Sequence, residues 1–272
     1  MAETAPSICP SCGAERLHRF CPQCGEQRLG PEDASLWRYL GDAWENLAQF
    51  DSKFLRSLRG LVNPGRITQD YLAGRRVKLL KPLQLFLLIN VVYFFALERS
   101  DIFFNHWRYA KDRSSLGMSL RELGESKMQR LGVTEESFRK QHDQLAQQWS
   151  KALIVALIPL VALGSWVLFG RSRRYYTEHL TFSAHYLGFM LLWMMVWILM
   201  LKYAFKIYRG AWVWEPIAYG LLAWMIIGTK RVFAEPWWKS VPKSFGLFLL
   251  GQSLLFDFYR DLVSVVAIIF MD

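Results

Sequence analysis

The sequence predicts an all-α integral membrane protein with about five transmembrane helices, an amphipathic interfacial helical neck and a small N-terminal zinc ribbon. Three observations support this fold class. The chain is 53% hydrophobic over 272 residues, and its apolar residues are gathered in long runs, as is typical of membrane proteins. All 4 cysteines lie in two C-x-x-C pairs near the N-terminus. A segment that mixes apolar and basic residues connects these pairs to the first long apolar run.

These features divide the chain into three regions. We expect a zinc ribbon over residues 1–30 and amphipathic interfacial helices over 31–81. A transmembrane helical bundle follows over 82–272, and it includes a polar helical loop at 99–151.

The strongest chemical motif is C-x2-C-x8-C-x2-C, in which both pairs read CPxCG. A glycine after the second cysteine tolerates unusual dihedral angles, so backbone N–H groups are free to bond the thiolates. Two such knuckles supply a tetrahedral four-sulfur site that has no open coordination position, so we expect a structural zinc and no catalytic role. Iron is the alternative metal, and either would supply most of the folding energy of so short a segment. The predicted ligands are Cys9, Cys12, Cys21 and Cys24.

His18 lies between the two pairs, and we expect it to be a neighbouring or exposed residue, because four cysteines already complete the site. Thiols that serve as metal ligands indicate a reducing compartment, which predicts a cytosolic N-terminus. No signal-peptide pattern precedes Pro82, so the first apolar run is expected to be an uncleaved anchor.

The neck is predicted to contain two amphipathic helices. Apolar residues recur at helical spacing from Leu36 to Leu47, and a second stripe runs from Phe54 to Val62 after a helix cap at Asp51 or Ser52. Basic residues on the opposite face suit a helix lying in the membrane interface. A cytosolic helix packed against the ribbon is the alternative.

Five apolar runs are long enough, or nearly so, to cross a hydrocarbon core that needs roughly 20 residues of helix. Short basic loops favour a cytosolic N-terminus and a C-terminus on the outer side. The loop at 99–151 carries less weight because acids offset its cations. We place the spans at 82–98, 152–170, 182–205, 211–228 and 244–271.

The long loop itself is polar and prone to form helices. Ser119 and Glu122 fit a capping box that opens a short helix, and Gly132 is expected to stop it. A second helix is predicted to start near Thr134 and to run directly into the second span.

Two blocks resemble a family of uncharacterised bacterial integral membrane proteins, known as a domain of unknown function. The first contains Pro64-Gly65-Arg66, Tyr71, Gly74-Arg75-Arg76 and Pro82, after the double C-x-x-C ribbon. The second has the pattern Tyr176, Glu178, His179, Phe182, His185 and Phe189. The resemblance implies a bacterial inner membrane location and no established activity.

In the first block, Pro64-Gly65 is expected to break a helix and Gly74 to close a short one. A basic collar follows, which suits anionic headgroups. Its role is either to orient the anchor or to form a specific lipid headgroup or phosphate site. The collar consists of Arg66, Arg75, Arg76, Lys78 and Lys81.

Ionisable residues inside apolar spans suggest a second kind of site. Asp257, Arg260 and Asp261 share one face of a regular helix, and Glu215 is expected at a similar depth. We predict that these four residues form an intramembrane polar cluster. The alternative is that 257–261 is an interfacial break before a short apolar tail.

A third candidate site contains Glu178, His179 and His185 on the cytosolic side. Six residues correspond to about 240° of helical rotation beyond a full turn, so the two histidines do not share a face and a metal site is not favoured. We expect His185 to face the interior of the bundle as a hydrogen-bonding residue.

These features favour a zinc-ribbon docking or regulatory membrane protein over an enzyme. A small-solute or ion transporter or channel that uses the polar cluster is the alternative, and a lipid-acting membrane enzyme is the second alternative. The expected partners are anionic membrane lipids and a protein bound through the ribbon. Nucleic-acid binding is not favoured, because the ribbon has few aromatic residues for stacking.

Overall fold

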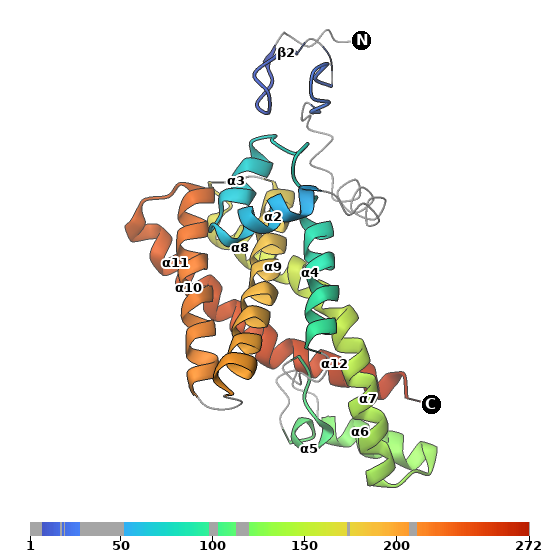
Figure 1. The fold of residues 1–272 in the computed structure, drawn as a ribbon. Helices are drawn as coiled ribbons and strands as arrows, with labels where there is room; N and C mark the ends of the chain where they lie inside the picture. The colour runs from blue at the N-terminus through green and yellow to red at the C-terminus, as the bar shows by residue number, and fades with distance from the viewer. Residues whose placement is uncertain are drawn as a thin grey trace. The chain divides into compact units, whose positions relative to one another are not determined.

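The computed structural model describes residues 7–16, 18, 20–27, 52–97, 103–112, 120–172, 175–206 and 211–271. These residues form two compact units, and each is composed of two chain segments. Unit 1 draws on Met1–Tyr93 and Ala162–Gly246, and unit 2 on Phe94–Val161 and Leu247–Asp272. Both are helical apart from the N-terminal ribbon, as the sequence predicts (Figure 1).

The ribbon of unit 1 begins with a short antiparallel pair of strands, β1 (Ser7–Ile8) and β2 (Glu15–Arg16). An isolated antiparallel bridge joins Phe20 to Gln27 in the second half. Each half is therefore a small hairpin whose turn contains one C-x-x-C pair.

Two short helices follow, α2 (Ser52–Val62) and α3 (Arg66–Leu72). The predicted break between them is confirmed: Gly65 has a φ of 72°, and an added Cβ atom there would lie 2.7 Å from the carbonyl oxygen of Gly228. Only glycine fits this turn without strain, because the φ is positive and another backbone approaches closely. Gly74, at a φ of 91°, follows α3 as predicted.

The longer helices of unit 1 pack around aromatic side chains. Trp224 is buried between Phe182 and Phe189, and its indole N–H donates to the backbone carbonyl of Leu61 at 3.0 Å, which ties α10 to the end of α2. These helices are α4 (Pro82–Ala96), α8 (Leu157–Phe169), α9 (Tyr176–Met200) with a π-helical end at Leu201–Phe205, α10 (Ala211–Phe233) and α11 (Trp237–Ser253). The last residues of α4, the first of α8 and the end of α11 belong to unit 2.

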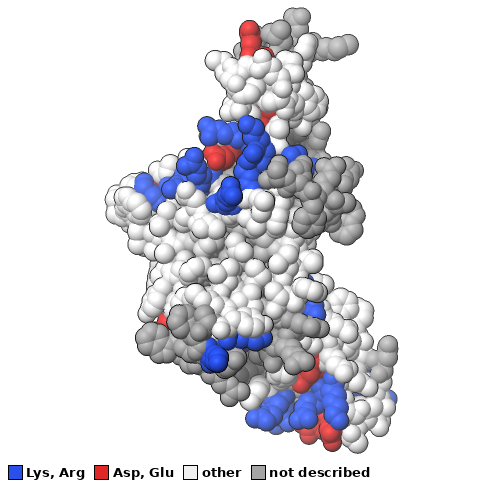
Figure 2. Space-filling view, viewed as in Figure 1, with Lys and Arg blue, Asp and Glu red and all other residues white. Residues whose placement is uncertain are grey.

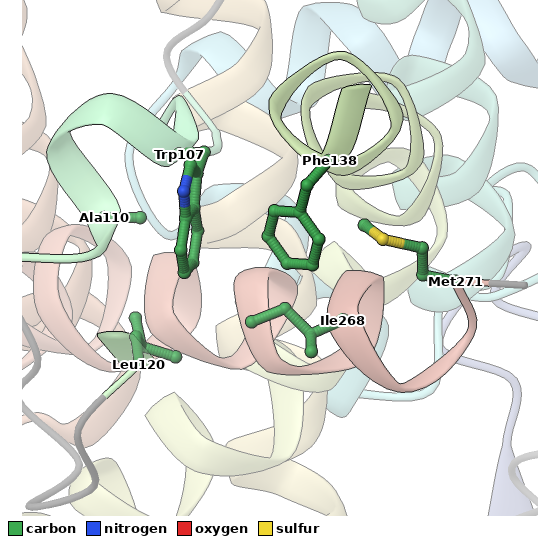
Figure 3. Packing of buried hydrophobic residues seen from close by; sticks show 6 residues of the cluster. All are labelled: Trp107, Ala110, Leu120, Phe138, Ile268 and Met271. Carbon is green, nitrogen blue, oxygen red and sulfur yellow. The ribbon is translucent and has the colours of Figure 1, made fainter. Parts of the chain in front are cut away.

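Unit 2 is built from α5 (Trp107–Ala110), α6 (Leu120–Leu131), α7 (Glu135–Leu153) and α12 (Arg260–Ile269). A π-helical turn, Leu254–Tyr259, precedes α12. The core of the unit is apolar. The rings of Trp107 and Phe138 pack edge to face, with their centres 4.9 Å apart (Figure 3). The buried side chains of this core are Trp107, Ala110, Leu120, Phe138, Ile268 and Met271.

The long loop matches its predicted helices. Gly132 has a φ of 65° and follows the end of α6, whereas Thr134 caps α7 by accepting a bond from the Ser137 N–H at 3.4 Å. From there the chain is helical through η2 (Ile154–Ala156) into α8. The predicted continuity of this helix into the apolar run 152–170 is thus confirmed as far as Phe169. Ser119 and residues 31–51, which include the first of the two predicted neck helices, lie outside the described residues.

Among the described residues, two helices are long and apolar enough to cross a membrane, by length and composition only. They are Glu135–Phe169, of 35 residues, and Tyr176–Tyr203, of 28. They cover the predicted spans 152–170 and 182–205 except for the last one and the last two residues, respectively, and the five-span prediction is supported only in this part. Pro82–Ala96 is a shorter apolar helix. Its 15 residues extend about 22 Å, less than the roughly 30 Å of a hydrocarbon core.

Candidate metal centre and its docking contact

The four predicted ligands converge in the ribbon. Their Sγ atoms all lie within 4.8 Å of one another, with Cys9 and Cys24 3.6 Å apart and Cys12 and Cys21 3.5 Å apart. A zinc ion with four Zn–S bonds of about 2.3 Å places its sulfurs about 3.8 Å apart. The geometry therefore fits a tetrahedral metal ion. His18 is exposed, as expected of a residue that does not bind the metal.

Both halves of the ribbon use the same backbone geometry. The N–H of Gly13 donates to the carbonyl of Cys9 at 2.9 Å, and the N–H of Gly25 donates to Cys21 at the same distance. The two glycines have φ angles of 78° and 73°. This confirms the role predicted for the glycine of each CPxCG knuckle, because other residues rarely adopt positive φ.

The thiols of the site differ in acidity: against the effect of backbone donors, burial and neighbouring thiols raise the pKa of Cys12 and Cys24, whereas that of Cys21 is lowered. The backbone N–H of Cys24 lowers the pKa of the Cys21 thiol to about 6, although burial of the thiol opposes this change. Metal binding needs the thiolate form. The backbone therefore prepares at least one sulfur as a ligand near neutral pH.

A buried carboxylate next to the centre connects the ribbon to the segment after α3. Glu26 is 1% exposed and accepts bonds from the backbone N–H groups of Arg76, at 3.0 and 3.2 Å, and Val77, at 3.1 Å. It also accepts a bond from the Ser11 hydroxyl at 2.6 Å. Since Ser11 lies inside the first knuckle and Glu26 follows the second, one carboxylate joins both knuckles to residues 76–77.

This contact depends on the turn that ends α3. With Gly74 in the left-handed region, the N–H of Arg75 bonds back to the carbonyl of Asp70 at 3.0 Å, and the next two N–H groups point to Glu26. Pro10 of the first knuckle lies against Gly74, where an added Cβ atom would be 3.5 Å away. Sequence reasoning missed Glu26 as a functional residue. The only sequence signal is an acidic residue directly after a CPxCG knuckle.

The basic collar is partly engaged within unit 1. Arg75 pairs with Asp70 at 2.8 Å, and Arg66 approaches the same carboxylate at 3.9 Å. The guanidinium of Arg76 lies over the Tyr71 ring, 4.5 Å from its centre. Lys78 is exposed and Lys81 half-buried. Figure 2 shows a band of Lys and Arg side chains on the surface of the molecule.

The three residues of the other predicted site, Glu178, His179 and His185, have separate surroundings. Glu178 accepts a bond from the backbone N–H of Tyr175 at 3.4 Å and so caps α9. His179 is buried and bonds to Ser165 at 2.8 Å. His185 is also buried and bonds to Thr68 of α3 at 2.9 Å. These contacts describe a helix cap and two links between helices.

The predicted intramembrane cluster is divided by environment. Asp257 is exposed and accepts a bond from Ser253, whereas Asp261 is 3% exposed. The π-helical turn just before Arg260 interrupts the regular α-helical spacing on which the common face was predicted. Glu215 is exposed and belongs to unit 1. Its pairing with the other three residues stays a prediction.

Comparison with known proteins gives a partial match. Residues 51–94 match a family described as a protein of unknown function (DUF3667). This segment runs from the start of α2 through Gly74 and residues 76–77, which contact Glu26, into α4. The match supports the resemblance to an uncharacterised family. The comparison with curated proteins and that with solved structures gave no match.

Proposed function

We propose that the protein is a membrane-anchored docking or regulatory protein, in which a structural zinc ribbon is held beside a lipid-binding basic collar. The observation that carries this proposal is the buried Glu26 carboxylate, which joins the two metal knuckles to the backbone of Arg76 and Val77. Because this carboxylate is buried and bonded on both sides, the contact holds the ribbon against residues 76–77.

The chemistry of the ribbon supports binding over catalysis. Four thiolates leave a tetrahedral zinc without an open position, so the metal stabilises the fold and presents the surrounding surface. Exposed side chains of the ribbon include Ile8, at 76%, and Phe20, at 55%. Apolar groups presented by a metal-folded module suit contact with another protein.

The collar supplies the second half of the proposal. Arg66, Arg75 and Lys78 are exposed, and the apolar helices of the same unit provide the anchor. Basic residues beside an anchor favour anionic lipid headgroups by about 1 kcal/mol each near the surface. We place the collar and the ribbon on the cytosolic side of a bacterial inner membrane.

The experiment purifies the full-length protein from native membranes and identifies co-purified proteins by mass spectrometry. It compares the unmodified protein with Cys9→Ser/Cys12→Ser, with Glu26→Gln, and with the matched control Glu15→Gln on the exposed edge of β2. Loss of partners in the cysteine variant and in Glu26→Gln, but not in the control, supports docking. An unchanged set of partners in the cysteine variant would overturn it.

Lipid binding is tested separately by counting the anionic lipids retained by the purified protein. Arg66→Gln/Lys78→Gln should lower this number, while Arg130→Gln, on the exposed end of α6, should not. Equal retention in both variants would show that the collar only orients the anchor.

A further inference from the structure

Unit 2 has two adjoining hollows on the face formed by α5 and the first half of α7. Their volumes are about 470 and 390 Å³. Arg108 and Arg139 line both, which makes them the centre of a shared concave surface. The first hollow is further lined by His106, Tyr109, Lys140, Asp143 and Gln144, and the second by Trp107, Lys111, Glu135 and Glu136.

The acidic residues of this surface are already engaged. Glu135 pairs with Lys111 at 2.7 Å, and Glu136 pairs with Lys140 at 3.0 Å. Asp143 accepts the backbone N–H of Trp107 at 2.8 Å and contacts His106 at 2.9 Å. Each carboxylate therefore has a partner within the unit.

Among the described residues, neither of the two central guanidinium groups forms an ion pair with a carboxylate. Arg139 forms no ion pair within the described part of the chain, and the guanidinium of Arg108 contacts the neighbouring Tyr109, with a 3.0 Å bond to its hydroxyl. Two guanidinium groups beside one concavity repel each other. An anion that binds between them is attracted by both and relieves this repulsion, so its binding is favoured. Their planar donor groups match the oxygens of phosphate and carboxylate.

The surface is rigid because its two helices are fixed from behind. Asp143 holds the first turn of α5, and the Trp107 side chain of that turn is buried against Phe138 of α7 (Figure 3). The backbone that carries the binding groups is therefore already ordered before a ligand binds.

The length of the helix argues for a ligand that comes from water. The Glu135–Phe169 helix has 35 residues, or about 52 Å, which exceeds the hydrocarbon core. Asp143 lies nine residues, about 14 Å, before the apolar stretch that starts near Ala152. The headgroup layer is only about 5–7 Å thick on each side.

We propose that these hollows form a binding site for a water-soluble anion that carries a phosphate or carboxylate group. Arg108 and Arg139 bind the anionic group, and Lys140 and His106 line the edge of the site. This site is in unit 2, so it does not depend on the docking role proposed for the ribbon.

The test uses the full-length protein in phosphatidylcholine nanodiscs, with calorimetric titration of inorganic phosphate and pyrophosphate. Arg139→Gln and Arg108→Gln should each weaken pyrophosphate binding by roughly tenfold, the effect of one lost charged hydrogen bond. Arg130→Gln, which removes the same charge elsewhere in unit 2, should change it less than about twofold.

Two results would overturn the proposal. One is an absence of pyrophosphate or phosphate binding by the unmodified protein at millimolar concentration, and the other is an equal loss of affinity in Arg130→Gln.

A further experiment distinguishes a soluble ligand from a lipid headgroup by repeating the titration in nanodiscs that contain phosphatidylglycerol. Unchanged affinity supports a soluble ligand, whereas Arg139-dependent retention of that lipid and weaker pyrophosphate binding would assign the site to a lipid headgroup instead. The variants should have the same melting temperature as the unmodified protein, so that a loss of affinity is not caused by unfolding.

Discussion

The ribbon over residues 7–27 and the helical core of unit 2 are both small, but they are stabilised in different ways. The ribbon has two-residue strands and four converging thiolates, whereas unit 2 buries Trp107, Phe138 and Ile268 between helices. A chain of about twenty residues cannot bury enough apolar surface to offset its conformational entropy. We therefore expect metal bonds to replace a hydrophobic core in the ribbon.

The largest expected effect is loss of metal. Chelation, or Cys9→Ser/Cys21→Ser, should unfold the ribbon, since structural zinc contributes on the order of 10–16 kcal/mol in such modules. Hydrogen exchange should become fast at 9–27 and at the amides of Arg76 and Val77, while α7 and α12 stay protected. Zinc analysis of the purified protein gives the control. If the ribbon amides stayed protected from exchange after metal removal, the ribbon would not depend on metal for its fold.

The matching experiment on unit 2 removes the centre of its core. Trp107→Ala should lower the free energy of unfolding of this unit by about 3–5 kcal/mol, because the ring is 1% exposed and fills the space between α5, α6 and α7. Tyr109→Ala, in the same helix but 56% exposed, should cost less than about 0.5 kcal/mol. Chemical unfolding, monitored through helix content by far-ultraviolet circular dichroism, measures the free energy of unfolding of both variants. The zinc content should remain unchanged in each variant.

A smaller effect tests how tightly that core is packed. Gly124→Ala would place a Cβ atom 2.2 Å from the Trp107 ring, so we expect about 1–3 kcal/mol of destabilisation despite the better helix propensity of alanine. Gly251→Ala in α11 meets nothing within 4 Å and should be neutral or stabilising. Similar melting temperatures for the two variants would show that the Trp107 side chain moves aside easily.

The smallest effect concerns an ion pair that belongs to neither region. Although burial opposes its ionisation, Glu235 between α10 and α11 has a lowered pKa because Lys243, 2.7 Å away, and Ser172 bond to its carboxylate. Its stabilisation, about 1 kcal/mol, is therefore present above the ordinary glutamate pKa and is lost as the pH falls through the lowered value.

Lys243→Met should remove this pH dependence. Unfolding measured from neutral pH down to pH 3 tests it, and Lys239→Met should have a smaller effect because Lys239 acts on Glu235 only through its charge, without a hydrogen bond. An unchanged slope in Lys243→Met would show that the pair contributes nothing.

Local features were predictable from sequence because local chemistry determines them. Proline and glycine restrict or extend backbone conformations, so the break at Pro64-Gly65, the turn at Gly74 and the end of α6 at Gly132 match the structure. The CPxCG knuckles match for the same reason. The π-helical turn before Arg260 was missed, because a one-residue change of helical register has no marked signal in composition.

The sequence alone determined the helical class, the four cysteines that converge in the ribbon and the positions at which helices start and stop, since each depends on residues close together in the chain. Only the tertiary structure decided which distant groups meet. Glu26 reaches residues fifty positions later, and Asp143 organises α5 from α7. These contacts involve single carboxylates and backbone N–H groups, which every non-proline residue carries. Their partners therefore follow from chain folding and not from residue type.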